Sequence, residues 1–300
     1  MARQIVECIP NFSEGRDSAK VEKIARAIGE AGVAVLRTET DTDHNRSVIT
    51  FVGMPERVGE AAVRGIAAAA ELIDLRAHMG VHPRAGAADV VPFVPIEGVT
   101  MEDCVALAHR TGEDVWRRLG IPVYFYEAAA RRPERVRLEN VRREARAEGA
   151  HDPDIGGPEF HPSAGTVVIG ARKLLVAFNM NLATADLQVA KRIARAIRAS
   201  SGGMQNVKAL GLPLASRGMV QVSTNLTDFE MTPPHVVYLA VKREAETLGV
   251  KVAEMELIGL MPRQAMEMAA RDGFRFEHID VSRVLENRID EEWGTIQPSR

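Results

Sequence analysis

Cysteine is scarce in this sequence, with only Cys8 and Cys104 among 300 residues. The two thiols show neither a CxxC spacing nor another spacing typical of metal ligands. This scarcity argues against a disulfide-stabilised secreted domain and against a cysteine-ligated metal. We expect a reduced protein whose two thiols are both buried.

Long hydrophobic runs are also missing. No window approaches the roughly 18–20 apolar residues that a membrane span needs, and the N-terminal MARQIVECIPNFSEGRD lacks the apolar region of a signal peptide. We therefore expect a soluble, cytoplasmic protein with no membrane partner. The net charge of −3 provides no general attraction to nucleic acid, so local arginines must bind any anionic ligand.

Several common catalytic motifs are absent from the sequence. There is no GxSxG nucleophile elbow, and neither cysteine has a nearby histidine to activate it. The GxGxxG and GxxxxGK[ST] fingerprints are absent too, which argues against dinucleotide-binding and P-loop folds.

The histidine spacing does not indicate a metal site. His78 and His82 are four residues apart, but Gly80 and Pro83 interrupt the helix that would place both on one face. No HExxH glutamate is present. The DTDHN segment at 41–45 is typical of a hydrogen-bonded turn. We predict no metal.

The hydrophobic pattern predicts the same order of elements in both halves of the chain. In the first half we expect strands at 4–9, 33–38, 47–52 and 90–94, and helices at 18–31 and 55–73. A helix at 101–119 and a strand at 123–126 follow. In the second half we expect strands at 171–180, 207–210, 219–226 and 252–258, and helices at 185–199 and 234–248. Each half has the β-α-β-β-α-β order of a ferredoxin-like unit.

A charged helix and a Pro/Gly-rich loop at 131–162 have the composition of a junction between two domains. We therefore expect an α+β protein with subdomains at 1–165 and 166–300. A sheet with helices on one face needs cover on its other face. The two sheets are expected to cover each other and to enclose a crevice.

The stretch 74–95, DLRAHMGVHPRAGAADVVPFVP, concentrates titratable and cationic side chains between two scaffold elements. His82 is our candidate acid/base, because an imidazole titrates near pH 7 without a large shift in pKa. Arg84 is a candidate anion contact, and we interpret His78 as support.

Other polar side chains gather at the predicted strand ends, where asparagine, arginine and histidine suit a planar ligand that carries carboxylates. Those candidates are Asn11, Ser13, Glu14, Asp41, His44, Asn45, Arg46, His161, Ser163, Gly165, Asn179 and Asn181. Each of them alone is as readily explained by a turn or a helix cap.

Several long blocks resemble the glutamate formimidoyltransferase family, the folate-dependent transferases of histidine degradation. They are ECIPNFSEGRD, DTDHNRSVITFVG, DLRAHMGVHPRAGAADVVPFVP, GAR-x-LLVAFN-x-NL and ELIGLMP. The resemblance extends over essentially all 300 residues. We expect only the transferase half, without the cyclodeaminase domain to which it is often fused in animals.

The resemblance implies transfer of a formimidoyl group from N-formimidoyl-L-glutamate to N5 of the co-substrate tetrahydrofolate, with release of glutamate. It also implies two tandem ferredoxin-like (βαββαβ) subdomains whose sheets enclose a ligand channel, and a homodimer. His82, in VHPRAG, matches the catalytic acid/base of the family.

The folate-binding stretch of the family matches ten consecutive residues: Ser163, Ala164, Gly165, Thr166, Val167, Val168, Ile169, Gly170, Ala171 and Arg172. For the donor we predict contacts from Asp41, His44, Arg46 and Arg84. A carboxylate from Asp41 or Asp43 suits the cationic amidine, and the arginines suit the carboxylates of glutamate.

Two alternatives share these residues. One is a related folate enzyme that uses N-formylglutamate or 5-formyltetrahydrofolate, and the other is a folate-binding protein without turnover.

Overall fold

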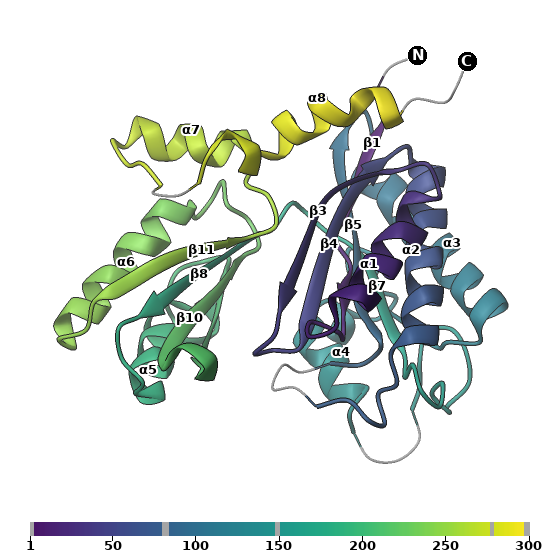
Figure 1. Ribbon diagram of the computed structural model, residues 1–300, viewed down its shortest axis with the longest axis horizontal. Helices are drawn as coiled ribbons and strands as arrows, with labels where there is room; N and C mark the ends of the chain where they lie inside the picture. Colours follow the sequence, from purple (N-terminus) through teal and green to yellow (C-terminus); the bar gives the residue numbers. More distant parts are fainter. Residues whose placement is uncertain (1–2, 80–83, 148–150, 277–278, 297–300) are drawn as a thin grey trace. The chain divides into compact units, whose positions relative to one another are not determined.

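The computed structural model describes residues 3–79, 84–147, 151–276 and 279–296. The chain divides into two units, residues 1–173 with 292–300, and residues 174–291. Each unit has its own sheet and its own large hydrophobic core. Figure 1 shows the ribbon coloured along the chain, with most of the helices and strands labelled.

The sheet of unit 1 has seven strands. They are β1 (Ile5–Cys8), β2 (Asn11–Phe12), β3 (Ala34–Asp41), β4 (Arg46–Gly53), β5 (Ala88–Glu97), β6 (Val123–Glu127) and β7 (Val167–Ala171). β1 and β2 lie between β4 and β5, and β3 pairs with the far edge of β4. These antiparallel pairings give the strand order of a ferredoxin-like unit. They confirm the predicted β-α-β-β-α-β order in the first half of the chain.

Two further strands extend that sheet beyond β5. β7 pairs in parallel with β5 on one side and with β6 on the other, so the last strand in sequence lies inside the sheet and β6 forms its edge. The helices of this unit are α1 (Ser18–Gly29), α2 (Pro55–Leu72), α3 (Met101–Leu119) and α4 (Leu138–Glu144).

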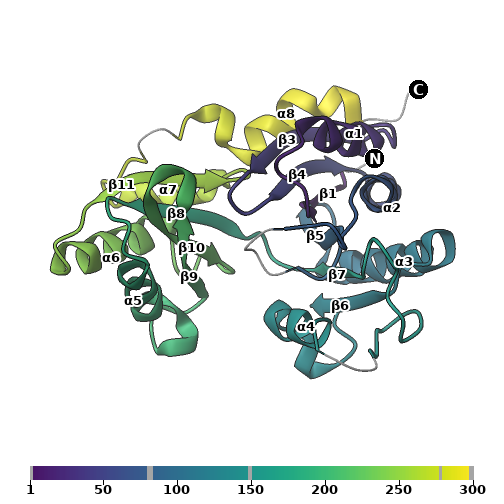
Figure 2. The ribbon, with the colours of Figure 1, turned by 60° about the horizontal axis from the view of Figure 1, so that its bottom comes forward.

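Alternation along the strands of unit 1 produces two cores. Val167 and Ile169 of β7 face the larger core, which is closed by α1, α2 and α3. Val168, between them, faces a smaller core with Tyr124 and with Val141 of α4. Figure 2 shows α3 and α4 on opposite sides of β6 and β7.

Local signals fix the ends of these helices. Thr100 and Asp103 form a reciprocal capping box at the start of α3, and Gly120 ends that helix with a φ of 65°. Asp17 caps α1 by accepting hydrogen bonds from the backbone N–H groups of Ala19 and Lys20.

Unit 2 has a four-stranded antiparallel sheet in the order β11-β8-β10-β9. Its strands are β8 (Val176–Leu182), β9 (Val207–Leu214), β10 (Met219–Leu226) and β11 (Val252–Ile258). Helices α5 (Leu187–Ile197), α6 (Pro234–Thr247) and α7 (Arg263–Arg271) contribute to its core, and α8 (Leu285–Ile296) follows. The predicted β-α-β-β-α-β order is confirmed here as well.

The sequence interpretation differs from the structure around residue 170. The expected strand at 171–180 is instead divided between β7 and β8, because Val167–Ala171 completes the sheet of unit 1. The segment 131–162 lies within unit 1, between β6 and β7, and the units divide after Lys173, later than the expected boundary at 165/166. Within the described ranges no helix is long and apolar enough to cross a membrane.

Candidate active site

A small pocket in unit 1 brings together residues that are distant in the sequence. It is lined by Ser13, Asn45, Arg46, Arg84 and Asp89. Ser13 follows β2, Asn45 and Arg46 lie at the β3–β4 turn, and the other two come from the chain before and at the start of β5. Four of these five residues are among the sequence candidates, and Asp89 lies in the stretch 74–95.

The segment after β2 is held against the β3–β4 turn. Gly15 donates its backbone N–H to Oδ1 of Asn45 at 3.0 Å. A Cβ atom on Gly15 would lie 2.3 Å from the carbonyl oxygen of Asp41, so this approach requires glycine. Glu14 accepts hydrogen bonds from the N–H groups of Arg16 and Asp17 at 2.9 and 3.0 Å, which makes its carboxylate a local cap.

Asp41 and His44 form a pair inside the turn. The carboxylate of Asp41 accepts a hydrogen bond from the backbone N–H of His44 at 2.9 Å, and its second oxygen lies 2.5 Å from the ring Nδ1 of the same residue. Burial alone would raise the pKa of Asp41, but the hydrogen bonds from His44 outweigh it and lower that pKa. Asn45 next to this pair has a φ of 48°, a left-handed conformation that asparagine tolerates. The predicted turn at 41–45 is confirmed.

Arg84 contacts both the turn and His78. Its Nη2 donates to the carbonyl oxygen of His44 at 3.4 Å, and its Nη1 lies 2.5 Å from both ring nitrogens of His78. Burial lowers the pKa of His78, and the nearby charge of Arg84 lowers it further, so the imidazole is neutral at pH 7. This contact places the His78 ring directly beside the Arg84 guanidinium.

Asp89 connects the pocket to helix α4. It is 2% exposed, and its Oδ1 accepts the backbone N–H of Ala85 at 2.7 Å. Its Oδ2 accepts a hydrogen bond from Nη2 of Arg142. Arg142 was not among the sequence candidates, because it lies in a run of arginines that is typical of a solvated helix face.

The predicted folate stretch is joined to the chain that precedes β5. Ala87 donates its N–H to the carbonyl oxygen of Ala164 at 2.8 Å, and Thr166 donates its N–H to Ala85 at 3.1 Å. A Cβ on Gly86 would lie 1.7 Å from the carbonyl oxygen of Thr166, so the two backbones approach at a glycine. Ser13 reaches the same place through its Oγ, which donates to the carbonyl oxygen of Gly86 at 2.7 Å.

Most of that stretch is buried. Val167–Ala171 is strand β7, and all five residues are buried. Ser163, Gly165 and Arg172 remain partly exposed at the two ends of the stretch. His161 bonds to Gly165 through two backbone hydrogen bonds of 2.9 and 3.0 Å, which close the turn before β7.

His82 lies outside the described residues, as do its neighbours at 80, 81 and 83. Cys8 and Cys104 are buried and free, as expected. Burial raises the pKa of both thiols, that of Cys104 to about 12, so neither is a thiolate at neutral pH. Among the described residues no group of three or more His, Cys, Asp or Glu side chains is placed to hold a metal ion.

Asn179 and Asn181 lie in the other unit, on the face of β8 opposite to the buried Phe178 and Met180. Asn181 is fully buried, and its Oδ1 accepts a hydrogen bond from Gln221 at 2.9 Å. Its Nδ2 donates to a carboxylate oxygen of Glu254 at 3.2 Å. The structure thus places these two candidates on the polar face of the unit 2 sheet.

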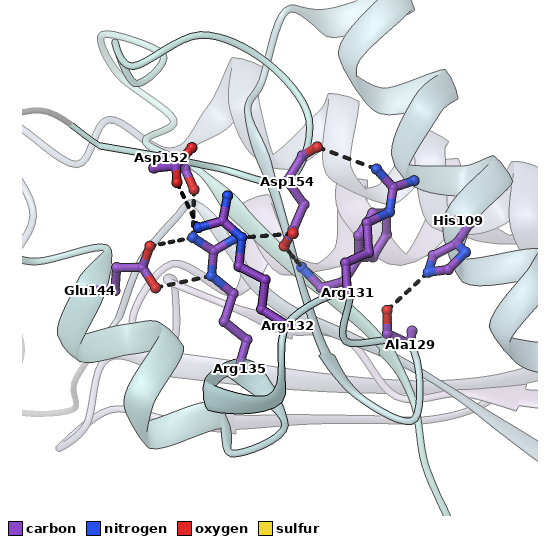
Figure 3. A network of polar contacts seen from close by, with 9 residues as sticks. His109, Ala129, Arg131, Arg132, Arg135, Glu144, Asp152 and Asp154 are labelled. Carbon is purple, nitrogen blue, oxygen red and sulfur yellow. Dashed lines mark hydrogen bonds and ion pairs between the residues drawn. The ribbon is translucent and has the colours of Figure 1, made fainter.

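The chain between β6 and β7 holds α4 through a second cluster of charges (Figure 3). Arg135 is 1% exposed, and it pairs with Glu144 and, at 3.0 Å, with Asp154. Its guanidinium also lies over the ring of Tyr124, 4.8 Å from the ring centroid. Asp154 in turn accepts the backbone N–H of Phe125 at 2.8 Å, which fixes the cluster to β6.

Comparison with known families gives two adjacent matches. Residues 5–172 match the family described as "Formiminotransferase domain, N-terminal subdomain". Residues 177–288 match the family described as "Formiminotransferase domain".

Curated relatives extend this similarity over nearly the whole chain. A glutamate formimidoyltransferase of Thermoplasma acidophilum is 45% identical, over 95% of this chain and 97% of its own length. One of Streptococcus pyogenes serotype M1 is 42% identical, over 95% of this chain and 99% of its own. A formimidoyltransferase-cyclodeaminase of Rattus norvegicus is 41% identical, over 89% of this chain but only 52% of its own length.

Proposed function

This chain belongs to the formiminotransferase domain family, and on that premise we propose that it is a glutamate formimidoyltransferase. It transfers the formimidoyl group of N-formimidoyl-L-glutamate to N5 of tetrahydrofolate and releases L-glutamate, a step of histidine degradation. The observation that carries this proposal is the 42–45% identity to curated glutamate formimidoyltransferases, over almost the full length of this chain and of each relative.

The chemistry requires one proton to change position. N5 of tetrahydrofolate attacks the formimidoyl carbon and forms a new C–N bond, which yields a tetrahedral intermediate. The bond from that carbon to the glutamate nitrogen then breaks. A proton leaves N5, and a proton must reach the departing nitrogen, because an amine leaves poorly unless it is protonated. A single general acid/base can take the first proton and supply the second.

His82 is the proposed acid/base. Its support is the VHPRAG motif shared with the family and the suitability of an imidazole for both proton transfers near pH 7. Cys8 and Cys104 are unsuited to act as nucleophiles, since both thiols are buried with raised pKa values. We propose a direct transfer between the two bound substrates.

Arg46, Arg84, Asp41 and His44 are the proposed donor contacts. Arg46 and Arg84 line one pocket, and a guanidinium can hold a carboxylate through two parallel hydrogen bonds. The lowered pKa of Asp41 keeps its carboxylate charged at neutral pH, as contact with a cationic amidine requires. His44 fixes the orientation of that carboxylate through its two hydrogen bonds.

Ser163–Arg172 is the proposed folate-binding stretch, with tetrahydrofolate as a co-substrate. Because Val167–Ala171 is buried in β7, direct contacts to folate are assigned to the partly exposed Ser163, Gly165 and Arg172 at its ends. The buried residues between them fix the position of those ends. The same proposal includes a cytoplasmic location and a homodimer. Sedimentation of the purified protein measures the oligomeric state.

A panel of donors tests the function. The purified protein is assayed with tetrahydrofolate as acceptor and N-formimidoyl-L-glutamate or N-formyl-L-glutamate as donor, and product formation is followed by absorbance. We expect turnover with the formimidoyl donor. Faster turnover with the formyl donor would identify the related formyltransferase instead, and folate binding without turnover of either donor would leave a binding protein.

His82→Ala tests the acid/base, with His151→Ala as its matched control. His151 stacks on Phe160, 3.8 Å between ring centroids, and is not part of the proposed site. We expect His82→Ala to lower kcat about 10²–10⁴-fold while tetrahydrofolate still binds. We expect the control to keep its activity. Largely intact transfer by His82→Ala at pH 7 would show that another group moves the proton.

A further inference from the structure

Asp89 is a buried carboxylate that the transfer chemistry does not use. Its side chain lines the pocket beside Arg46 and Arg84. An asparagine oxygen could accept the Ala85 N–H equally well, so this hydrogen bond alone does not require a charge. The negative charge is matched instead by Arg142, which approaches from α4. The hydrogen bond to Ala85 therefore does not by itself explain why Asp89 and Arg142 form a charge pair.

The pair also sets the charge balance of the pocket. Arg46, Arg84 and Arg142 lie around Asp89, and Asp41 is a further carboxylate that acts on Arg46, so three cations face two carboxylates and positive charge is in excess. Burial lowers the pKa of Arg46 and of Arg84, the charge of Arg142 lowers both further, and Asp89 opposes this change. A further carboxylate, brought by a ligand, would relieve the repulsion among the arginines.

Helix α4 presents Arg142 from a fixed position. Val141 and Ala145, on either side of it in sequence, are buried in the smaller core of unit 1. Glu144 pairs with the buried Arg135, as Figure 3 shows. The side chains of Arg142 and Asp89 are themselves 18% and 3% exposed, so their contact is largely shielded from solvent. Shielding of this kind makes the pair sensitive to the loss of either partner.

We propose that Arg142 is a positioning residue for donor binding. By holding Asp89 it fixes Ala85, and with it the adjoining Arg84, so that Arg84 and Arg46 together bind one carboxylate of the donor. This inference rests on the proposed function for the identity of the donor. It places a determinant of donor affinity on α4, outside the residues that contact the substrate.

Three variants test the proposal in the full-length protein: Arg142→Ala, Arg142→Lys and the control Arg143→Ala. Arg143 is the next residue on α4, carries the same charge and is exposed. We expect Arg142→Ala to raise KM for N-formimidoyl-L-glutamate and the inhibition constant of glutarate about tenfold. KM for tetrahydrofolate should stay unchanged, Arg142→Lys should restore part of the donor affinity, and Arg143→Ala should match the wild type.

Asp89→Asn provides a second route if Arg142→Ala does not fold. It keeps the side-chain volume and the acceptor for Ala85 but removes the charge. We expect the same selective rise in KM for the donor. The double variant Asp89→Asn/Arg142→Lys should have a donor KM no higher than that of Asp89→Asn alone, because the two residues act as one unit. An equal rise in both KM values, or a donor KM identical to that of Arg143→Ala, would overturn the proposal.

The failure of the proposed function has a different signature. If the wild type transfers no formimidoyl group, that function is wrong, and calorimetric titration with glutarate then decides the role of Arg142. Weaker glutarate binding by Arg142→Ala than by Arg143→Ala supports the positioning role. Equal binding by the two variants, or no binding to the wild type, contradicts it.

Discussion

Gly15 and Gly86 allow four segments of backbone to meet around the pocket. The segment after β2 approaches the β3–β4 turn at Gly15, and the chain before β5 approaches Thr166 at Gly86. Neither residue has a side chain that could take part in chemistry. Their role is to bring Asn45, Ser13 and Arg84 close to one another. The pocket can form only because these two glycines have no Cβ atom.

Gly86→Ala is expected to destabilise the protein by about 2–4 kcal/mol, because its Cβ would overlap the backbone carbonyl of Thr166 and both segments would have to move. Urea unfolding measures this loss. Gly157→Ala is the matched control, since a Cβ there meets no atom within 4 Å. Equal midpoints for the two variants would show that the close approach is relaxed in solution.

The residues of the pocket were predictable from the sequence to different degrees. Ser13, Asn45, Arg46 and Arg84 lie in turns and loops of distinctive composition, and the structure brings them together. Arg142 looks like its exposed neighbours in the sequence, and only its contact with Asp89 distinguishes it. Long-range pairing of this kind leaves no periodic signal, so sequence patterns could not identify it.

At the scale of elements, the short helix α4 depends on charges that its own residues only partly supply. Arg135 comes from the 3₁₀ turn before the helix, and Asp154 comes from the loop after it. Together they tie both sides of α4 to β6 (Figure 3). A helix of seven residues has little stability by itself, so we attribute its order to this cluster and to Val141.

Arg135→Met is expected to lower the free energy of unfolding by about 3–5 kcal/mol, since it leaves the carboxylate of Asp154 buried at 2% exposure without its cation. Arg132→Met is the matched control. Arg132 pairs with Asp152 at the surface, and its loss should cost about 1 kcal/mol or less. Urea unfolding of both variants measures the difference, and similar losses would mean that solvent reaches Asp154.

At the scale of the whole molecule, the order of elements was predictable and the extent of each sheet was not. Hydrophobic periodicity predicted both ferredoxin-like units, including the positions of α2 and α3. It did not place β7, because an apolar run such as Val167–Ala171 does not reveal which strands it will pair with. The composition of 131–162 resembles a linker, yet that segment contains α4 and the Arg135 cluster.

Fragments of the chain test where the first unit ends. A fragment of residues 1–173 should unfold cooperatively in urea, because it retains all seven strands of its sheet. A fragment of residues 1–165 lacks β7 and leaves β5 and β6 without their shared neighbour, so we expect it to aggregate or to lose its cooperative transition. Equal stability of the two fragments would place the boundary at the earlier position.

The position of β7 also has a consequence for synthesis on the ribosome. β6 emerges about forty residues before β7, and during that interval β5 and β6 both present open parallel edges with no strand between them. The nascent chain therefore passes through a period in which the two edges can pair wrongly with each other or with another chain. Slow translation between residues 127 and 167 would prolong this exposure, whereas early binding of a chaperone to β6 would protect the yield of folded protein.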